Sequence, residues 1–496
     1  MTKKHEYLGI LYAALGSLTF GYALSTGSTI IGLSGFVDYY NIDTFGPDPA
    51  YANQIQGALN GIFFAGGAFG AVFQGVVADR YGRRRALQVT CVIMLVATIL
   101  LTASVHIGMF LAGRLLQGFA AGMLNTICPV YQSEIAPASH RGAMVGMHGF
   151  TFVMGQATCT WVGVGCYHMI NGQIAWRLLC ALQAVPTIAL AGGTLVMLES
   201  PRWLIAHAQY DTALNTLRKL HGKGHSYEED EHIAQTSLHS IRAQVELDAR
   251  QKTTFLGMLR HRPSMRRLLT GFGTMAVNQC TGQTVVWSYQ VNLLQGLGVL
   301  NDGPLLVLAG FMTLGAICNG GGGFVLDKLG RRKTYLIGLI MCIATLSVHT
   351  AMIAEYSGTT NRVGQGTGIA MLFVFVTFFA GCIDVTTYVY CSEIFPTCHR
   401  AQGMSYSVAF FFCLCALWTS MAPTVMAKIS WGYYCIFIGL SSINFTLEEI
   451  GQLFGDDVAP DAANADGNEV VHVMDPPTPS DEKFANSVHL EDKDIA

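Results

Sequence analysis

Eleven long apolar segments constrain the fold of this chain more than any other feature of its sequence. A helix needs about 20 mostly apolar residues to cross roughly 30 Å of bilayer hydrocarbon. The alternating ten-residue strands of a membrane β-barrel do not occur in the sequence. We therefore predict an all-α membrane protein. The segments are 8–32, 54–78, 86–105, 108–130, 143–168, 178–198, 268–291, 303–326, 333–354, 367–390 and 404–427.

The charge content agrees with this class and excludes others. Only 12% of the residues are charged, against about 25% in soluble domains. The net charge of −3 leaves no basic footprint for nucleic acid. The 14 cysteines form no C-x-x-C pair, and we interpret them as small apolar packing residues. We expect no metal, no cofactor and no nucleic-acid partner, and a lipid bilayer as the surroundings.

Basic residues gather on alternate loops between the segments. The other loops hold only Arg177, Arg362 and Lys428. Because basic loops stay in the cytoplasm, we expect both termini to be cytoplasmic. The basic loops contain Arg80, Arg83, Arg84, Arg85, Arg141, Lys328, Arg331, Arg332, Lys333 and Arg400, and the loop 199–267 adds eleven more.

A long polar loop separates the first six of these apolar segments from the other five and a shorter twelfth segment. We expect a six-helix bundle at 1–198, a helical cytoplasmic linker at 199–267 and a second bundle at 268–445. The acidic, proline-containing tail at 446–496 is predicted to be mostly disordered.

The two halves share repeated motifs. Residues 130–141 read V-Y-Q-S-E-I-A-P-A-S-H-R and residues 389–400 read V-Y-C-S-E-I-F-P-T-C-H-R, so eight of twelve positions are identical. The motif D-R-Y-G-R-R from Asp79 recurs as D-K-L-G-R-R from Asp327. Duplicated halves around a central loop are typical of alternating-access transporters.

These motifs resemble the sugar porter branch of the major facilitator superfamily, over about residues 8 to 450. The resemblance also includes G-R-L-L-Q-G from Gly113, E-S-P-R-W-L from Glu199, N-Q-C-T-G from Asn278 and S-E-I-F-P-T from Ser392. It implies the major facilitator fold, with two bundles of six helices around a central site. The resemblance further implies a fungal plasma membrane protein, and we expect it to work as a monomer.

Charged residues of the repeated motifs are predicted to form a cytoplasmic gate. Carboxylate–guanidinium pairs are directional, and pairs between the halves could latch one state of the carrier. Each pair at a wet surface contributes only about 0–1 kcal/mol, so the latch would need several. The predicted gate residues are Asp79, Arg80, Arg83, Glu134, Arg141, Asp327, Arg331, Glu393 and Arg400.

A substrate site is predicted near the midplane, where amides and rings could bind a sugar. Polar side chains crowd the seventh segment, and polar groups inside a membrane are costly unless they face a cavity or another helix. The resemblance places sugar-binding amides at Asn278, Gln279 and Gln156, and aromatic positions at Tyr388 and Phe412. The predicted site residues are Gln156, Asn278, Gln279, Thr284, Tyr289, Tyr388 and Phe412.

The sequence departs from the family pattern at its usual proton carrier. Many proton-coupled members carry an aspartate where this chain has Ala23, although the arginine that would face it is kept as Arg114. Gly149 and Gly315 also stand where relatives often carry amides. Asp384 lies within the tenth segment, and an intramembrane carboxyl indicates function. We therefore name Asp384, with Arg114, as the candidate proton site.

The twelfth segment is short. Its apolar run, Trp431–Phe445, has 15 residues and would span only about 22 Å as a helix. We expect a twelfth helix that is truncated.

The sequence thus predicts a facilitative carrier for a monosaccharide or polyol. The alternatives are a proton symporter for the same solutes and a non-transporting nutrient receptor. No nucleophile–base pair or metal-ligand cluster stands out, so we do not expect an enzyme.

Overall fold

The computed structural model divides the chain into two compact units, 1–445 and 446–496, and the cavity discussed below belongs to the first. The described residues are 3–44, 46–135, 141–221, 227–251, 257, 262–296, 298–299, 301–356, 359, 361–395 and 400–453.

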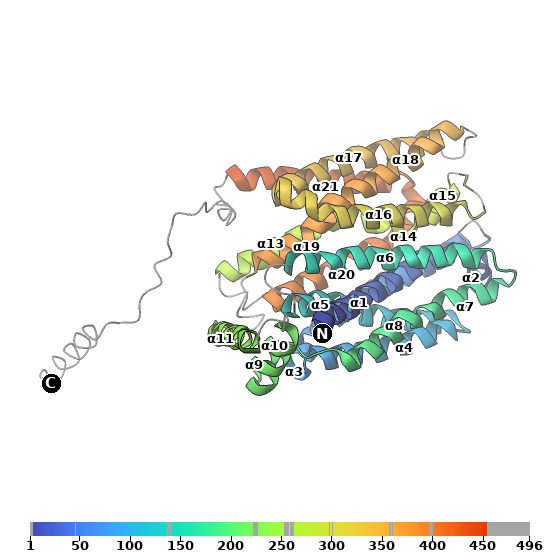
Figure 1. Ribbon diagram of the computed structural model, residues 1–496. Coiled ribbons are helices and arrows are strands. Elements are labelled where there is room, and N and C mark those ends of the chain that lie inside the picture. The colour runs from blue at the N-terminus through green and yellow to red at the C-terminus, as the bar shows by residue number, and fades with distance from the viewer. Residues whose placement is uncertain are drawn as a thin grey trace, which may run out of the picture. The chain divides into compact units, whose positions relative to one another are not determined.

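The first half of the chain forms the helices coloured blue to green in Figure 1. Helix α7 leads directly into α8, so that Gly172–Val196 forms one membrane span. The helices are α1 (Lys3–Ile31), the short α2 (Ser34–Tyr40), α3 (Pro49–Tyr81), α4 (Arg83–Thr102), α5 (Ile107–Ile135), α6 (Arg141–Tyr167), α7 (Gly172–Leu182) and α8 (Ala184–Val196).

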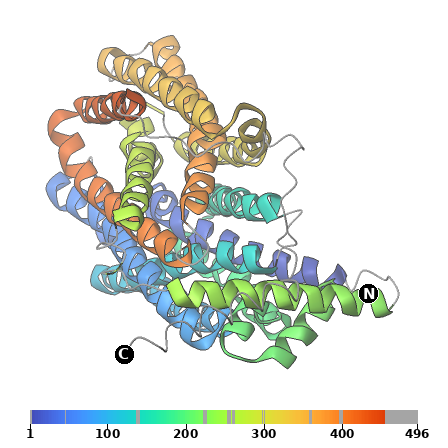
Figure 2. The same cartoon turned by 90° about the vertical axis from the view of Figure 1, so that its left-hand side faces the viewer.

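The second half forms the yellow-green to red helices of Figure 2, and one of them, α20, lies along α3 of the first half. Two of its spans are irregular: one is broken into α13, α14 and α15, and another contains a π-helical turn, η2. The elements are α13 (Arg262–Cys280), α14 (Gln283–Ser288), α15 (Gln290–Gly296), α16 (Gly303–Leu329), α17 (Arg331–Tyr356), α18 (Arg362–Phe378), η2 (Phe379–Asp384), α19 (Val385–Ile394), α20 (Arg400–Ile429) and α21 (Gly432–Leu453).

Three linker helices lie between the halves in sequence: α9 (Pro201–Ala206), α10 (Tyr210–His221) and α11 (Tyr227–Gln251). Ser200 caps α9, since its hydroxyl accepts a bond from the Trp203 N–H, and Pro201 begins the helix. Leu204, Ile205 and Ala213 form a small buried cluster. The linker helices lie at the left end of the first half in Figure 1, and we call this end the linker end.

Polar caps and glycines set the helix ends. Asp48 caps α3 and Asn171 caps α7, each by accepting bonds from backbone N–H groups of the first turn. The repeated D-x-x-G motifs turn the chain at Gly82 and Gly330, with φ of 93° and 80°. Such positive φ values favour glycine, so the duplication seen in the sequence is also present in the backbone.

The prediction of an all-α membrane protein is confirmed. Every element in the described ranges is helical. Eight helical segments there are long and apolar enough to cross a membrane. The other four predicted segments are occupied by α1, α6, the broken helix α13–α15, and α21.

The twelfth helix is longer than the sequence predicted. Helix α21 runs from Gly432 to Leu453, 22 residues, because helical structure continues through Thr446-Leu-Glu-Glu-Ile. The apolar run ends near Phe445 as expected, but the helix does not end with it. The expectation for the rest of the tail lies outside the described residues.

Glycines bring the helices of the first half into backbone contact. A Cβ at Gly118 of α5 would lie 1.9 Å from the Phe63 carbonyl oxygen of α3, and one at Gly122 would lie 2.0 Å from the Gly67 oxygen. Helices α1 and α6 meet in the same way, because a Cβ at Gly21 would lie 1.9 Å from the Phe152 oxygen. Small residues of this kind drive helix association in membranes.

We predict that Gly118→Ala separates α3 from α5. Overpacking of this kind costs about 1–3 kcal/mol, so the apparent unfolding temperature of the detergent-solubilised protein should fall. Gly192→Ala in α8 is the matched control, since its Cβ would meet nothing within 4 Å. An equal response of the two variants would contradict the close contact.

Candidate functional site

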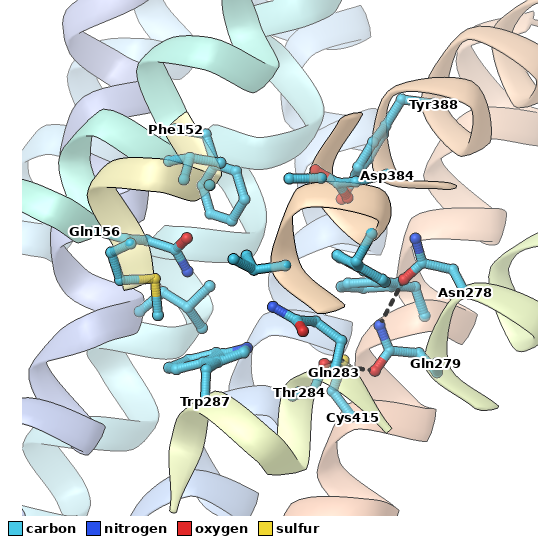
Figure 3. A pocket seen from close by; sticks show the side chains of 18 of the residues that line it. Phe152, Gln156, Asn278, Gln279, Gln283, Thr284, Trp287, Asp384, Tyr388 and Cys415 are labelled. Atoms are coloured by element: carbon cyan, nitrogen blue, oxygen red, sulfur yellow. Dashed lines mark hydrogen bonds between the residues drawn. The ribbon is translucent and has the colours of Figure 1, made fainter. Parts of the chain in front are cut away.

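A cavity lies between the two halves (Figure 3). Helices α1, α3 and α6 form one side, and elements from α13 to α20 form the other. Its walls contain amides, one carboxyl group and many aromatic rings. The lining residues are Phe20, Leu24, Phe64, Phe152, Val153, Gln156, Asn278, Gln279, Gln283, Thr284, Trp287, Met312, Gly315, Val376, Phe379, Ala380, Asp384, Tyr388, Phe411, Phe412 and Cys415.

The structure brings most of the predicted site residues together. The lining includes six of the seven predicted binding residues and the candidate proton site Asp384. Tyr289 is the seventh and does not line the cavity. The six are Gln156, Asn278, Gln279, Thr284, Tyr388 and Phe412.

A break in the seventh span places the amides in the cavity wall. Helix α13 ends at Cys280 and α14 begins at Gln283, with Gly282 at φ 77° between them. The amides hold one another: Gln279 Nε2 donates to Asn278 Oδ1 at 3.0 Å. The Thr284 hydroxyl donates to Gln279 Oε1 at 2.7 Å. These side chains are therefore oriented before any solute binds.

Gln283 differs from its neighbours because its Oε1 is buried and has no hydrogen-bond partner. Its side chain extends toward the middle of the cavity (Figure 3). A buried acceptor without a partner is costly, and a solute hydroxyl could satisfy it.

Asp384 ends the π-helical turn η2. Such turns shift the side chains that follow and often occur at functional sites. Asn319 of α16 donates from Nδ2 to Asp384 Oδ2 at 2.8 Å. A Cβ at Gly149 would lie 2.8 Å from Asn319 Oδ1, so the glycine of α6 leaves the room that Asn319 occupies.

Aromatic rings form the wall that faces the amides. Phe20 and Phe152 stack with centroids 4.8 Å apart. Phe412 meets Phe20 edge-on at 6.2 Å and Phe64 at the same distance. Rings that pack against one another present a stiff apolar surface.

Tyr289 instead joins the halves away from the cavity. Its hydroxyl donates to the carbonyl oxygen of Thr419 at 2.6 Å and lies 3.3 Å from that of Gln56. Asn292 Nδ2 donates to Gln56 Oε1 at 2.6 Å. Gln56 lies near the start of α3, so these bonds connect the halves at the end opposite to the linker end.

Arg114 does not line the cavity and is not brought together with Asp384. It is 1% exposed and donates to the carbonyl oxygens of Ala23 and Leu59. Its guanidinium also lies 4.4 Å from the centroid of the Phe63 ring. Backbone carbonyls thus bind the Arg114 guanidinium, and one of them belongs to Ala23.

The ion pairs that the structure describes among the predicted gate residues all involve Arg83. Arg83 binds Glu134 through Nε and Nη2, each at 3.0 Å, and Asp79 through Nη1 at 3.2 Å. Glu199 accepts bonds from the backbone N–H groups of Arg83 and Arg84. Burial raises the pKa of the Glu199 carboxyl, although these N–H groups oppose the shift. These contacts join α3, α4, α5 and the start of the linker, so they fix the α3–α4 turn, and a latch between the halves stays a prediction.

Six predicted gate residues remain: Arg80, Arg141, Asp327, Arg331, Glu393 and Arg400. Arg80 is exposed and lies against the Tyr81 ring. Arg331 begins α17 in the second half. The side chains of Arg141, Asp327, Glu393 and Arg400 lie outside the described residues.

Comparison with known proteins places the chain in a family. The family model described as "Sugar (and other) transporter" matches residues 9–447. This chain belongs to that family.

The relatives cover nearly the whole chain. The MFS-type transporter criB of Aspergillus cristatus is 30% identical, over 90% of this chain and 96% of that protein. The high-affinity glucose transporter of Kluyveromyces lactis is 27% identical, over 90% and 84%. The major myo-inositol transporter IolT of Bacillus subtilis is 27% identical, over 87% and 88%.

A solved structure shares the fold. The proton:xylose symporter XylE of E. coli, bound to 6-bromo-6-deoxy-D-glucose, superposes with a TM-score of 0.74 at 21% identity, covering 91% of this chain and 96% of that one. The predicted major facilitator fold is therefore confirmed.

The sequence analysis did not predict several residues at the cavity. Gln283 and Trp287 lie on the polar seventh span, and their spacing of four residues was a signal that they share a helical face. Asn319, which bonds to Asp384 without itself lining the cavity, was noticeable only as an amide one turn beyond Gly315. Phe20 and Phe152 gave no signal, because an apolar residue in an apolar span looks the same facing lipid or a cavity.

We predict that Arg83→Gln destabilises the protein strongly. Glu134, whose side chain is 9% exposed, would keep a buried charge without its partner, which costs about 3–5 kcal/mol. The neighbouring Arg85 is exposed, so Arg85→Gln is the control. Thermal unfolding in detergent measures both, and an Arg83→Gln protein as stable as the control would contradict the described ion pairs.

Proposed function

We propose that this transporter-family member is a facilitative carrier for a monosaccharide or a polyol. It would work by alternating access and without covalent chemistry. The observation that carries the proposal is the cavity between two repeated halves, with oriented amides on one wall and stacked rings on the other.

These walls suit a ring that carries hydroxyl groups. Amides both donate to and accept from hydroxyls, whereas the C–H faces of a sugar pack on aromatic rings. Relatives named for glucose and myo-inositol support the same solute class.

For transport, the hydrogen bonds that join the halves at the end opposite to the linker end would have to break. Gln56, Tyr289 and Asn292 join the halves there, and exchanging these bonds for water would open the cavity on that side. The first half would move as one body, because glycine contacts and the Arg83 ion pairs hold its helices. We place the chain in the plasma membrane as a monomer, with both termini cytoplasmic.

Counterflow in proteoliposomes tests this function. Vesicles loaded with unlabelled D-glucose, D-xylose or myo-inositol should take up the same labelled solute with saturable kinetics, because the loaded carrier exchanges faster than the empty one. Protein-free vesicles are the control. Binding without counterflow would favour the receptor function over the carrier.

We predict that Gln283→Ala weakens solute binding. The variant removes a buried acceptor that has no partner in the protein, and a hydrogen bond contributes about 0.5–1.5 kcal/mol, so KM should rise up to about tenfold. Gln365 is remote from the cavity lining and donates to the Thr359 carbonyl, so Gln365→Ala should leave KM unchanged. An unchanged KM in Gln283→Ala would remove Gln283 from the site.

Proton coupling is the second candidate, and Asp384 is the observation that favours it. A carboxyl inside the membrane can carry a proton together with the solute. We then expect an inward proton gradient to drive accumulation of the labelled solute above equilibrium, and Asp384→Asn to abolish the accumulation. Uptake that stops at equilibrium with and without the gradient would leave the facilitative carrier.

A further inference from the structure

We infer that Asp384 forms a subsite for a protonated amine, so that the preferred solute is an amine-bearing sugar or polyol. This inference rests on the proposed function and names its substrate class more closely. The first observation is the charge of the cavity: among the described residues that line it, Asp384 is the one acidic group and none is Lys, Arg or His.

Arg114, the basic residue named together with Asp384 as the candidate proton site, binds other groups of the protein. Arg114 lies outside the cavity lining and donates to Ala23 and Leu59 carbonyls and to Gln117 Oε1. The carboxylate that faces the cavity therefore has no cation from the described protein residues around it. An ion enclosed in a water-poor site needs a partner of opposite charge, and here the solute can supply one.

The carboxylate is held in place by two other helices. Asn319 of α16 donates to Asp384 Oδ2, and Asn319 fits there because α6 carries Gly149, whose Cβ would lie 2.8 Å from Asn319 Oδ1. One carboxylate oxygen is thus fixed by Asn319, and the Asn278 side chain also lies within hydrogen-bonding reach of the carboxylate. Residues of α6, α16 and η2 together set the position of this one side chain, which indicates that the carboxylate binds a ligand.

The surroundings of the carboxylate also suit a cation. Tyr388 follows Asp384 by about one helical turn, and Phe152 and Phe379 line the same cavity. Aromatic faces attract ammonium groups. A carboxylate beside rings therefore selects an ammonium over a neutral hydroxyl, while Gln279 and Gln283 remain for the hydroxyls of the same solute.

The test is competition for wild-type carrier by three sugars of similar shape. D-glucosamine, N-acetyl-D-glucosamine and D-glucose compete against labelled D-glucosamine in proteoliposomes, at a pH below the pKa of the amine. The protonated amine should inhibit at a concentration about tenfold lower than either neutral sugar. Equal or better inhibition by D-glucose overturns the inference, and this comparison needs no variant.

Variants then locate the subsite. Asp384→Asn should remove the tenfold preference and Asp384→Glu should restore part of it. Gly149→Ala, which pushes on Asn319, should reduce the preference and raise the KM for the amine more than that for D-glucose. Gly165→Ala on the same helix, where a Cβ meets nothing within 4 Å, is its control. Monodisperse elution in detergent shows which variants fold, and a preference that survives in folded Asp384→Asn overturns the inference.

The outcomes separate this inference from the proposed function. If no sugar or polyol exchanges, the carrier function itself fails. If neutral solutes exchange and the amine has no advantage, only the amine subsite fails. Accumulation of D-glucose driven by a proton gradient and lost in Asp384→Asn would also overturn it, because a proton would then neutralise the carboxylate.

Discussion

Backbone contact at glycines is the constraint on which this structure depends. Lipid tails are as apolar as leucine, so helices in a bilayer associate through close packing. Gly118 and Gly122 let α5 lie directly on α3, and Gly21 does the same for α1 on α6. Three of these helices, α1, α3 and α6, also supply the cavity residues of the first half. The aromatic wall is therefore built on the most tightly packed part of the molecule.

The second half solves the opposite problem, because it must expose polar groups inside the membrane. Irregular backbone is tolerated there only where it lines a cavity or is buried in protein. The break around Gly282 and the π-helical turn at Phe379–Asp384 both lie at the cavity. The second half thus supplies the carboxylate and three of the four amides that line the cavity, together with rings such as Trp287 and Tyr388, whereas the first half supplies Gln156 and three phenylalanines.

The sequence allowed the fold to be predicted because span length and repeated motifs are local signals. Asn278, Gln279 and Thr284, which the sequence analysis named as site residues, line the cavity, and polar residues in a membrane span have few other places to face. Tyr289 shows where this argument ends. It lies on the same polar span, but the break at Gly282 and the turn before α15 direct its hydroxyl to the Thr419 carbonyl.

Other differences come from contacts between residues far apart in sequence. Arg83 and Glu134 were predicted to act between the halves. They lie 51 positions apart in the sequence and bind each other within one half. The pairing of Asn319 with Asp384 depends on space left by Gly149 in a third helix. No pattern within a single helix contains that information.

The π-helical turn also has a consequence for how such a carrier changes in evolution. The turn holds one residue more than an α-helical segment of the same rotation, so the loss of one codon within Phe379–Asp384 would return the helix to α geometry and leave Tyr388 facing the cavity. A codon lost elsewhere in the same helix would instead rotate every later residue by about 100° about its axis. This turn is therefore a place where the helix can lose a residue and still show the same face to the solute.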